Sequence, residues 1–109
     1  ISRAGWIGDY VDPNNFLDMW LCTSGNNRTG WCNPEYDRLI LEQAPSAATE
    51  AERHAIFKRA ETILLKDLPI LPIYPYTSKH LVHPSVKNVA SNILNQNYFR
   101  DIYLQPGSD

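Results

Sequence analysis

Residues 33–44 read NPEYDRLILEQA, and this stretch decides the fold because it has the start, the periodicity and the end of an amphipathic helix. Asn33 is a favoured N-cap, and Pro34 suits the first helical position because its missing N–H would have no partner there. Apolar side chains recur at helical spacing on one face. They are Tyr36, Leu39, Ile40 and Ala44. Pro45 is predicted to end this helix.

A second helix is predicted over residues 49–67, which read TEAERHAIFKRAETILLKD. Thr49 and Glu52 have the spacing of a capping box, in which each side chain bonds to the backbone N–H of the other residue. The apolar face comprises Ile56, Ala60, Ile63 and Leu64, with Phe57 beside them. Leu68 and Pro69 close the helix. Both helices are amphipathic, so each needs a sheet or another helix to cover its apolar face.

The chain before the first helix is predicted to contain only short elements. Residues 2–6 carry apolar and aromatic side chains and are predicted to form a short strand. Residues 8–15 read GDYVDPNN and are rich in turn-forming residues, which indicates an irregular loop. Residues 16–21 are apolar apart from Asp18, which favours a short helical turn or a packed connection.

The chain after the second helix is predicted to be extended in short pieces. Prolines at positions 69, 72 and 75 forbid a regular central strand over residues 70–76, so an extended crossing segment or an edge strand is expected. Further extended pieces are predicted at residues 81–82 and 86–89, and a final strand at residues 98–104. The predicted elements are therefore two amphipathic helices and several short strands.

The composition is that of a globular protein and excludes several classes. Of the 109 residues, 43% are hydrophobic and 20% are charged, whereas wholesale disorder needs low hydrophobicity and high net charge. The net charge of −2 lacks the basic excess that is typical of nucleic-acid-binding proteins. No apolar run approaches the roughly 20 residues that span a bilayer. Because the first residues look like a strand entered part-way, we expect the chain to be a piece of a larger protein.

Two cysteines, Cys22 and Cys32, flank a polar loop. A pair that closes a loop of about ten residues is typical of a disulfide, which the sequence therefore predicts. Two buried free thiols are the alternative, and a metal site is disfavoured because no further Cys or His lies at ligand spacing nearby. A disulfide would indicate an oxidising compartment.

Few residues suggest catalytic chemistry. Asp9 and Asp12 are close enough in sequence to form an acid pair, but turn formation and a ligand-binding carboxylate are alternatives. His80 and His83 lie three residues apart on an extended segment, a spacing that does not direct both rings to one metal ion. The sequence has no nucleophile-elbow, phosphate-loop or dinucleotide-binding motif. Residues 27–29 match the N-glycosylation acceptor pattern, which is common by chance.

Three segments carry a resemblance to a known protein family. They read RAGWIGDYVDPNNFL (residues 3–17), NPEYDRLI (residues 33–40) and DLPILPIY (residues 67–74). In this order they resemble the C-terminal part of the periplasmic or lipid-anchored oligopeptide-binding proteins of bacterial ABC importers. The likeness covers nearly the whole chain and is weakest after residue 85. The Cys22 and Cys32 pair departs from the general pattern of the family.

The resemblance implies a solute-binding receptor and not an enzyme. Such receptors are several times longer than this chain and have two α/β lobes that close over an extended peptide. Residues 1–75 would form part of the second lobe, and residues 76–109 would return to the first. The implied partners are an oligopeptide, the membrane permease of the importer and the N-terminal part of the same protein, with no nucleic acid, metal or cofactor. The implied location is periplasmic or membrane-anchored outside the cytoplasm.

The resemblance also implies a ligand site in the first residues of the chain. Asp9 stands in the position that holds the α-ammonium group of the peptide. Arg3 stands in a position that lies near the C-terminal carboxylate of the peptide for some ligand lengths. The remaining implied site residues are Trp6, Ile7, Gly8 and Tyr10. Main-chain pairing with the peptide would read no side chains, so one site could accept many sequences.

Two other interpretations stay open. The chain could be an autonomous small domain with a structural or interaction role, or a small hydrolase in which Asp9 and Asp12 act as acid and base. As a piece of a receptor, it would expose strand edges and apolar faces that the rest of that receptor covers. We therefore expect the isolated chain to self-associate, with the proline-rich residues 69–76 as the hinge of an exchanged C-terminal arm.

Overall fold

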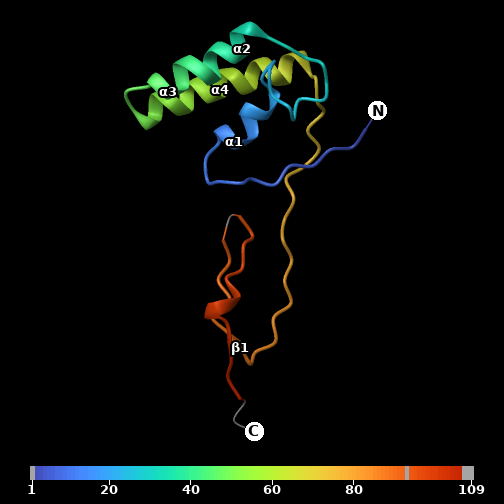
Figure 1. Cartoon of the computed structure of the whole chain (residues 1–109), viewed down its shortest axis with the longest axis vertical. Helices are drawn as coiled ribbons and strands as arrows, with labels where there is room; N and C mark the ends of the chain where they lie inside the picture. The colour runs from blue at the N-terminus through green and yellow to red at the C-terminus, as the bar shows by residue number, and fades with distance from the viewer. Residues whose placement is uncertain (1, 93, 107–109) are drawn as a thin grey trace. The chain divides into compact units, whose positions relative to one another are not determined.

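A computed structural model of the chain describes residues 2–92 and 94–106. The chain divides into two compact units, unit 1 (residues 1–73) and unit 2 (residues 74–109). The long helices belong to unit 1, and the two short strands belong to unit 2 (Figure 1). The implied ligand-site residues all belong to unit 1.

The second predicted helix is confirmed as α4, Glu50–Asp67. The Thr49 hydroxyl accepts a hydrogen bond from the backbone N–H of Glu52 at 3.1 Å, as an N-cap does. The Glu52 carboxylate accepts from the backbone N–H of Ala48 at 2.9 Å and not from that of Thr49, so only half of the predicted capping box is present. Leu68 ends the helix in the left-handed conformation, with a φ of 49°.

The first predicted helix is present, but it is longer and less regular than expected. Its segments follow one another without a break as α2 (Pro34–Arg38), the π-helical η2 (Leu39–Gln43) and α3 (Ala44–Ser46). The Asn33 side chain caps the start by accepting from the backbone N–H groups of Glu35 and Tyr36. Pro45 does not end the helix, contrary to the prediction: the helix continues to Ser46, because the change from the π-helical η2 to α3 directly before Pro45 accommodates a residue without an N–H.

The first residues form no strand. Residues 2–8 are irregular, so the strand predicted at residues 2–6 is wrong. A strand is stable only beside a partner that supplies hydrogen bonds, and the described part of unit 1 contains no other strand. The predicted helical turn follows as α1 (Asn14–Leu17) and the 3₁₀ segment η1 (Asp18–Trp20), which confirms that prediction.

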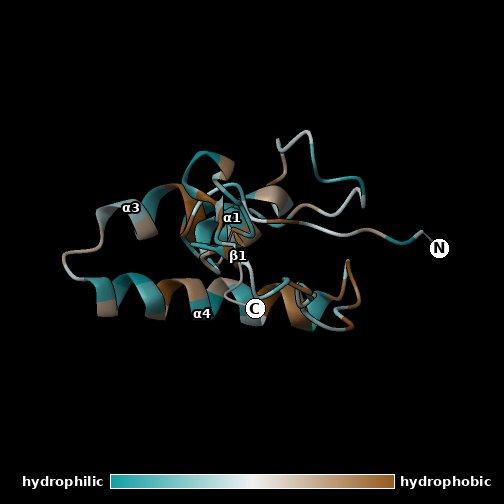
Figure 2. Ribbon diagram, turned by 90° about the horizontal axis from the view of Figure 1, so that it is seen from below, coloured by the Kyte–Doolittle hydropathy of each residue, from teal (hydrophilic) through white to brown (hydrophobic). Residues whose placement is uncertain are grey.

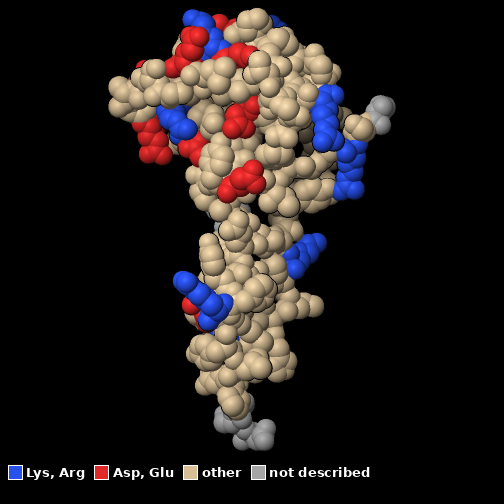
Figure 3. Space-filling model, viewed as in Figure 1, with Lys and Arg blue, Asp and Glu red and all other residues tan. Residues whose placement is uncertain are grey.

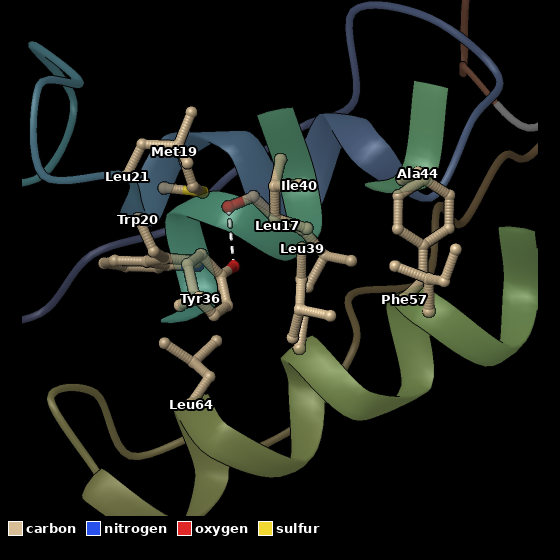
Figure 4. Packing of buried hydrophobic residues seen from close by; sticks show 12 residues of the cluster. Leu17, Met19, Trp20, Leu21, Tyr36, Leu39, Ile40, Ala44, Phe57 and Leu64 are labelled. Atoms are coloured by element: carbon tan, nitrogen blue, oxygen red, sulfur yellow. Dashed lines mark hydrogen bonds between the residues drawn. The ribbon is translucent and has the colours of Figure 1, made fainter. Parts of the chain in front are cut away.

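The core of unit 1 is built from helices packed on helices. Helix α4 contacts α2, η2 and α3 on one side and also contacts α1 (Figure 1). Polar and apolar segments alternate along α4, as its amphipathic sequence requires (Figure 2). The buried apolar cluster comprises Leu17, Met19, Trp20, Leu21, Tyr36, Leu39, Ile40, Ala44, Ile56, Phe57, Ala60 and Leu64 (Figure 4). Another helix, and not a sheet, therefore covers the apolar face of each predicted helix.

Tyr36 links α1 to α2 from the centre of this core. Its side chain is completely buried, and its hydroxyl donates a hydrogen bond to the backbone carbonyl of Leu17 at 2.7 Å (Figure 4). Its ring also meets the Trp31 ring edge to face, with centroids 5.0 Å apart. Burial raises the pKa of the Tyr36 phenol, which keeps the hydroxyl protonated as a donor.

Unit 2 contains one small antiparallel sheet. Strand β1 (Val86–Lys87) pairs with β2 (Tyr103–Leu104), and Val86 lies opposite Leu104. The extended piece predicted at residues 86–89 is thus a strand only over its first two residues. Asn88 ends it because its φ of 64° is left-handed and cannot continue a strand.

The other predicted strands of unit 2 are corrected by the structure. Residues 98–104 do not form one strand, since the 3₁₀ segment η3 (Phe99–Asp101) precedes β2. Residues 81–82 were also predicted to be extended, but they form no strand. Residues 70–76 also contain no regular strand, as the three prolines predict.

Candidate ligand-binding site

The six residues implied by the resemblance lie in one continuous segment before α1. Trp6 and Gly8 are partly buried. The exposed members are Arg3, Ile7, Asp9 and Tyr10. Among the residues that the structure describes, none forms a hydrogen bond or an ion pair with the Asp9 carboxylate. The Asp9 carboxylate of this segment is therefore exposed and has no partner among the described residues.

Asn15, in α1, holds this segment on both sides of Asp9. The indole N–H of Trp6 donates to Asn15 Oδ1 at 2.9 Å, and Asn15 Nδ2 donates to the backbone carbonyl of Tyr10 at 3.1 Å. Asn15 is only 1% exposed, and both the oxygen and the nitrogen of its side-chain amide have hydrogen-bond partners inside the protein. Nothing in the sequence singles out Asn15, because it lies at the end of a stretch, residues 8–15, that is rich in turn-forming residues throughout.

Tyr10 is held from the side of α1 and η1. Its hydroxyl donates to Asp18 Oδ2 at 3.0 Å, and the Asn14 amide donates to the same hydroxyl at 3.3 Å. Partial burial raises the pKa of the Tyr10 phenol, the Asn14 hydrogen bond opposes this shift, and the Asp18 carboxylate adds to it. The hydroxyl is therefore engaged within the protein, although the residue as a whole is 44% exposed.

Asp12 is fixed by an ion pair with α4. The Arg53 guanidinium donates to both Asp12 oxygens, at 2.7 and 2.9 Å, and also lies over the Phe57 ring, 4.6 Å from its centroid. The Arg53 hydrogen bonds hold the pKa of Asp12 below its ordinary value. Because both of its oxygens are engaged and it stays ionised, Asp12 is unsuited to act as the acid of an Asp9 and Asp12 pair.

Gly8 lies close to α1. A Cβ atom at this position would be 3.3 Å from Cζ of Phe16 and 3.6 Å from Nδ2 of Asn15, which is tighter than ordinary contact for the first atom. A larger residue would therefore displace the Phe16 ring or lift the backbone beside Asp9. The missing side chain lets this backbone lie against α1.

The predicted disulfide between Cys22 and Cys32 is confirmed, with Cα atoms 4.6 Å apart. Inside the closed loop, the Asn27 amide donates to three backbone carbonyls. These belong to Trp20, Leu21 and Trp31. The Thr29 hydroxyl donates to Asn27 Oδ1 at 2.8 Å. The residues of the glycosylation-like pattern thus organise the loop itself.

The described residues offer no cluster for a metal ion. No group of three His, Cys, Asp or Glu side chains in that part of the chain could hold one. His80 bonds to Asn95 and His83 bonds to Ser85, so the two rings have separate partners. Within residues 2–92 and 94–106, no helix is long and apolar enough to cross a membrane.

Two hollows on the described surface are lined by residues other than those of the implied ligand site. One hollow on the described surface lies beside Gln43, Ser46 and Arg59, and another lies in unit 2 beside Asn88. Neither contains the implied ligand-site residues. On the face of unit 1 that Figure 3 shows, acidic and basic side chains lie together on the left, whereas the right edge carries basic side chains alone.

Comparison with known proteins places these features in context. No protein-family profile matches the chain. Over 106 residues the chain is 38% identical to the oligopeptide-binding protein OppA of Bacillus subtilis. This match covers 96% of the chain and 19% of OppA. Over 105 residues the chain is 37% identical to the periplasmic murein peptide-binding protein MppA of Escherichia coli. This match covers 95% of the chain and 19% of MppA. The chain spans about one fifth of the length of these curated relatives.

A solved structure is similar as well. The periplasmic murein tripeptide-binding protein MppA, in an unliganded open form, matches with a TM-score of 0.70 and 36% identity, over 94% of this chain and 20% of that one. The chain is therefore homologous to a C-terminal segment of extracytoplasmic peptide-binding proteins, as its motifs indicated. Its helices and short strands fit that part of the periplasmic-binding-protein fold.

Proposed function

We propose that the chain is the part of a peptide-binding receptor that holds the α-ammonium group of an oligopeptide. The observation that carries this proposal is the placement of Asp9, an exposed carboxylate in a segment that Asn15 holds on both sides. The similarity to oligopeptide-binding and murein-peptide-binding proteins supports a peptide as the ligand. The role is binding and not catalysis.

Asp9 differs from its neighbouring carboxylates in having no partner among the described residues. Asp12 is paired with Arg53, and Asp18 accepts from Tyr10. An ammonium group enclosed away from water needs an opposite charge, because burying it alone is costly. A carboxylate is a fitting partner, since hydrogen bonds between two charged groups are the strong ones. Asp9 is thus the carboxylate of this segment that remains available to a ligand cation.

The backbone before Asp9 supports an extended ligand. Residues 4–9 form no backbone–backbone hydrogen bond with the described part of the chain, so their N–H and C=O groups are available. A peptide lying along them could pair main chain with main chain, independently of its sequence. The residues that we propose to contact the ligand in this mode are Arg3, Trp6, Ile7, Gly8 and Tyr10. Arg3 would approach the carboxylate end of the ligand at some ligand lengths.

The remaining wall of the site belongs, in this proposal, to the rest of a longer receptor. Residues 1–75 would lie in its second lobe and residues 76–109 would return to its first lobe. The receptor would deliver peptide to the membrane permease of an ABC importer from outside the cytoplasm. The Cys22–Cys32 disulfide supports an oxidising location of this kind.

A chimeric receptor tests the proposal. The segment of the Bacillus subtilis oligopeptide-binding protein that corresponds to this chain is replaced by this chain, and calorimetry measures binding of tri- to pentapeptides. Asp9→Asn should weaken binding by about 2–4 kcal/mol, because the enclosed ammonium group loses its charge partner. N-acetylated peptides, which have no ammonium group, should bind the Asp9→Asn chimera no more weakly than the unaltered chimera, because they leave the Asp9 carboxylate without a charge partner.

The matched control is Glu42→Gln, which neutralises an exposed carboxylate on η2. This variant should bind free-amine peptides like the unaltered chimera. Equal loss of affinity for free-amine and acetylated peptides in Asp9→Asn would contradict the role of Asp9. The absence of any peptide binding by the chimera would contradict the proposed function as a whole.

A further inference from the structure

Asn15 is the only buried polar residue in the described part of the chain. Its side chain is 1% exposed and uses both of its polar atoms, accepting from Trp6 at Oδ1 and donating to Tyr10 from Nδ2. A buried amide is costly unless both ends are satisfied, so these two bonds fix the conformation of whatever they join.

The two bonds join residues on either side of Asp9. Trp6 lies three residues before Asp9, and Tyr10 directly follows it, so the Asn15 amide closes a small loop around residues 7–9. The same loop lies against α1, because an ideal Cβ at Gly8 would be 3.6 Å from Asn15 Nδ2. The Asp9 backbone is therefore held from both directions by one side chain.

The bonds of Asn15 tie the loop around Asp9 to the edge of the helical core. Trp6 is partly buried and packs against the buried apolar cluster, whereas Tyr10 is exposed and lies outside that cluster. The backbone of Asn15 is already satisfied within the turn, since its N–H donates to the carbonyl of Asp12 at 3.1 Å. The side chain is thus not needed to start α1.

We propose that Asn15 is a positioning residue, which fixes Asp9 where the ammonium group of a ligand can meet it. The inference rests on the proposed function of Asp9 and adds the residue through which the carboxylate is oriented. Asn15 itself does not touch the ligand. A carboxylate on a mobile loop would have to be ordered when the ligand binds, and this ordering weakens binding.

The first test measures order in the full 109-residue chain by ¹⁵N relaxation. Asn15→Leu keeps a similar volume but removes both hydrogen bonds. The backbone order parameters of residues 7–9 should fall from about 0.85 to below about 0.6. Trp6→Phe removes one of the two bonds and leaves Asn15 in place, and it should also lower the order parameters of residues 7–9. This variant provides the test if Asn15→Leu does not fold. Unchanged order in these variants would overturn the inference.

The second test uses the chimeric receptor and the preference for free-amine over N-acetylated peptides. Asn15→Leu should reduce that preference by at least about tenfold, because it acts through the group that recognises the amine. Asn27→Leu is the matched control: it removes three hydrogen bonds from the disulfide loop and should leave the preference unchanged. Equal weakening of both peptides in Asn15→Leu would show a merely structural role and overturn the inference.

The two proposals fail in different ways. If Asp9→Asn leaves the preference unchanged, the proposed function of Asp9 fails, whatever Asn15 does. If Asp9→Asn abolishes the preference and Asn15→Leu does not reduce it, the positioning role alone fails.

Discussion

The Asp12 and Arg53 side chains connect segments that lie 41 residues apart in sequence. The contact is bidentate, and the two side chains are 27% and 32% exposed, so solvent screens it only in part. Phe57 supports the guanidinium from below, at 4.6 Å from its ring centroid. A partly buried pair of this geometry should lie at the upper end of the range for surface ion pairs, about 1 kcal/mol.

The stability of the chain should depend on pH through Asp12. Its pKa is lowered in the folded chain, chiefly by hydrogen bonds from Arg53. Such a carboxyl group stabilises the fold above its unfolded pKa of about 3.9, and this contribution is lost as the pH falls through its folded pKa. Asp12→Asn should therefore lower the free energy of unfolding by about 1 kcal/mol at pH 7 and by less at acid pH. Urea denaturation of both proteins at pH 7 and at acid pH measures this difference in the free energy of unfolding.

An exposed pair on α2 provides the comparison. Arg38 bonds to Glu35 three residues earlier, and both side chains are about half exposed, at 50% and 44%. Glu35→Gln should change stability by only about 0.3 kcal/mol, as helix-surface pairs do. An Asp12→Asn variant with an effect this small, or with the same effect at all pH values, would show that Arg53 does not stabilise ionised Asp12.

The sequence indicated the candidate ligand-binding residue Asp9, but it did not indicate the residues that hold the segment around it. Asp9 was open to three interpretations, and the motif around it carried the expectation of a ligand-binding role. Asn15 and the Asp12–Arg53 pair could not be predicted, because their roles arise from contacts between segments and leave no periodic pattern. An Asn beside turn-forming residues is equally typical of an exposed loop.

The N-cap of helix α4, Thr49, provides a further prediction. Thr49→Ala removes the side chain that accepts from the Glu52 backbone N–H and leaves this donor without its partner. The free energy of unfolding should fall by about 1 kcal/mol. Thermal and urea denaturation, followed by circular dichroism at 222 nm, measure the change.

Thr62→Ala is the matched control within the same helix. Thr62 is exposed and bonds back to the carbonyl of Lys58, an interaction that does not stabilise a helix interior. Because alanine is the better helix former, this variant should be neutral or slightly stabilising. Equal destabilisation by both substitutions would contradict the assignment of Thr49 as the N-cap.

The helices were predictable from sequence, and the strands were not. Caps at Asn33 and Thr49 and the apolar spacing between them are local signals, so both helices appear where expected. Pro45 misled the prediction because a change of helix type at α3 accommodates it. A strand depends on a partner elsewhere, and apolar residues at 2–6 do not show whether one is present.

The buried core of the described chain is concentrated in unit 1. All residues of the buried apolar cluster precede residue 65, whereas large apolar side chains farther along are exposed. Examples are Leu71, Ile73 and Leu81, at 77%, 80% and 106% exposure. Exposed apolar surface of this extent is typical of an interface. The relatives of this chain are about five times as long, so their additional residues could cover such a surface.

The isolated 109-residue chain should therefore self-associate. Its exposed apolar residues gain by leaving water, and its two-stranded sheet has outer edges that can pair with another copy. The prolines at positions 69, 72 and 75 keep residues 69–76 extended, which suits them as the hinge of an exchanged C-terminal arm. Sedimentation equilibrium should show a dimer or a larger assembly, and the double variant Leu71→Lys with Ile73→Lys should shift it towards the monomer. A monomer that melts cooperatively would refute this prediction and would favour an autonomous domain, because it would show that the chain needs no partner to cover its apolar surface.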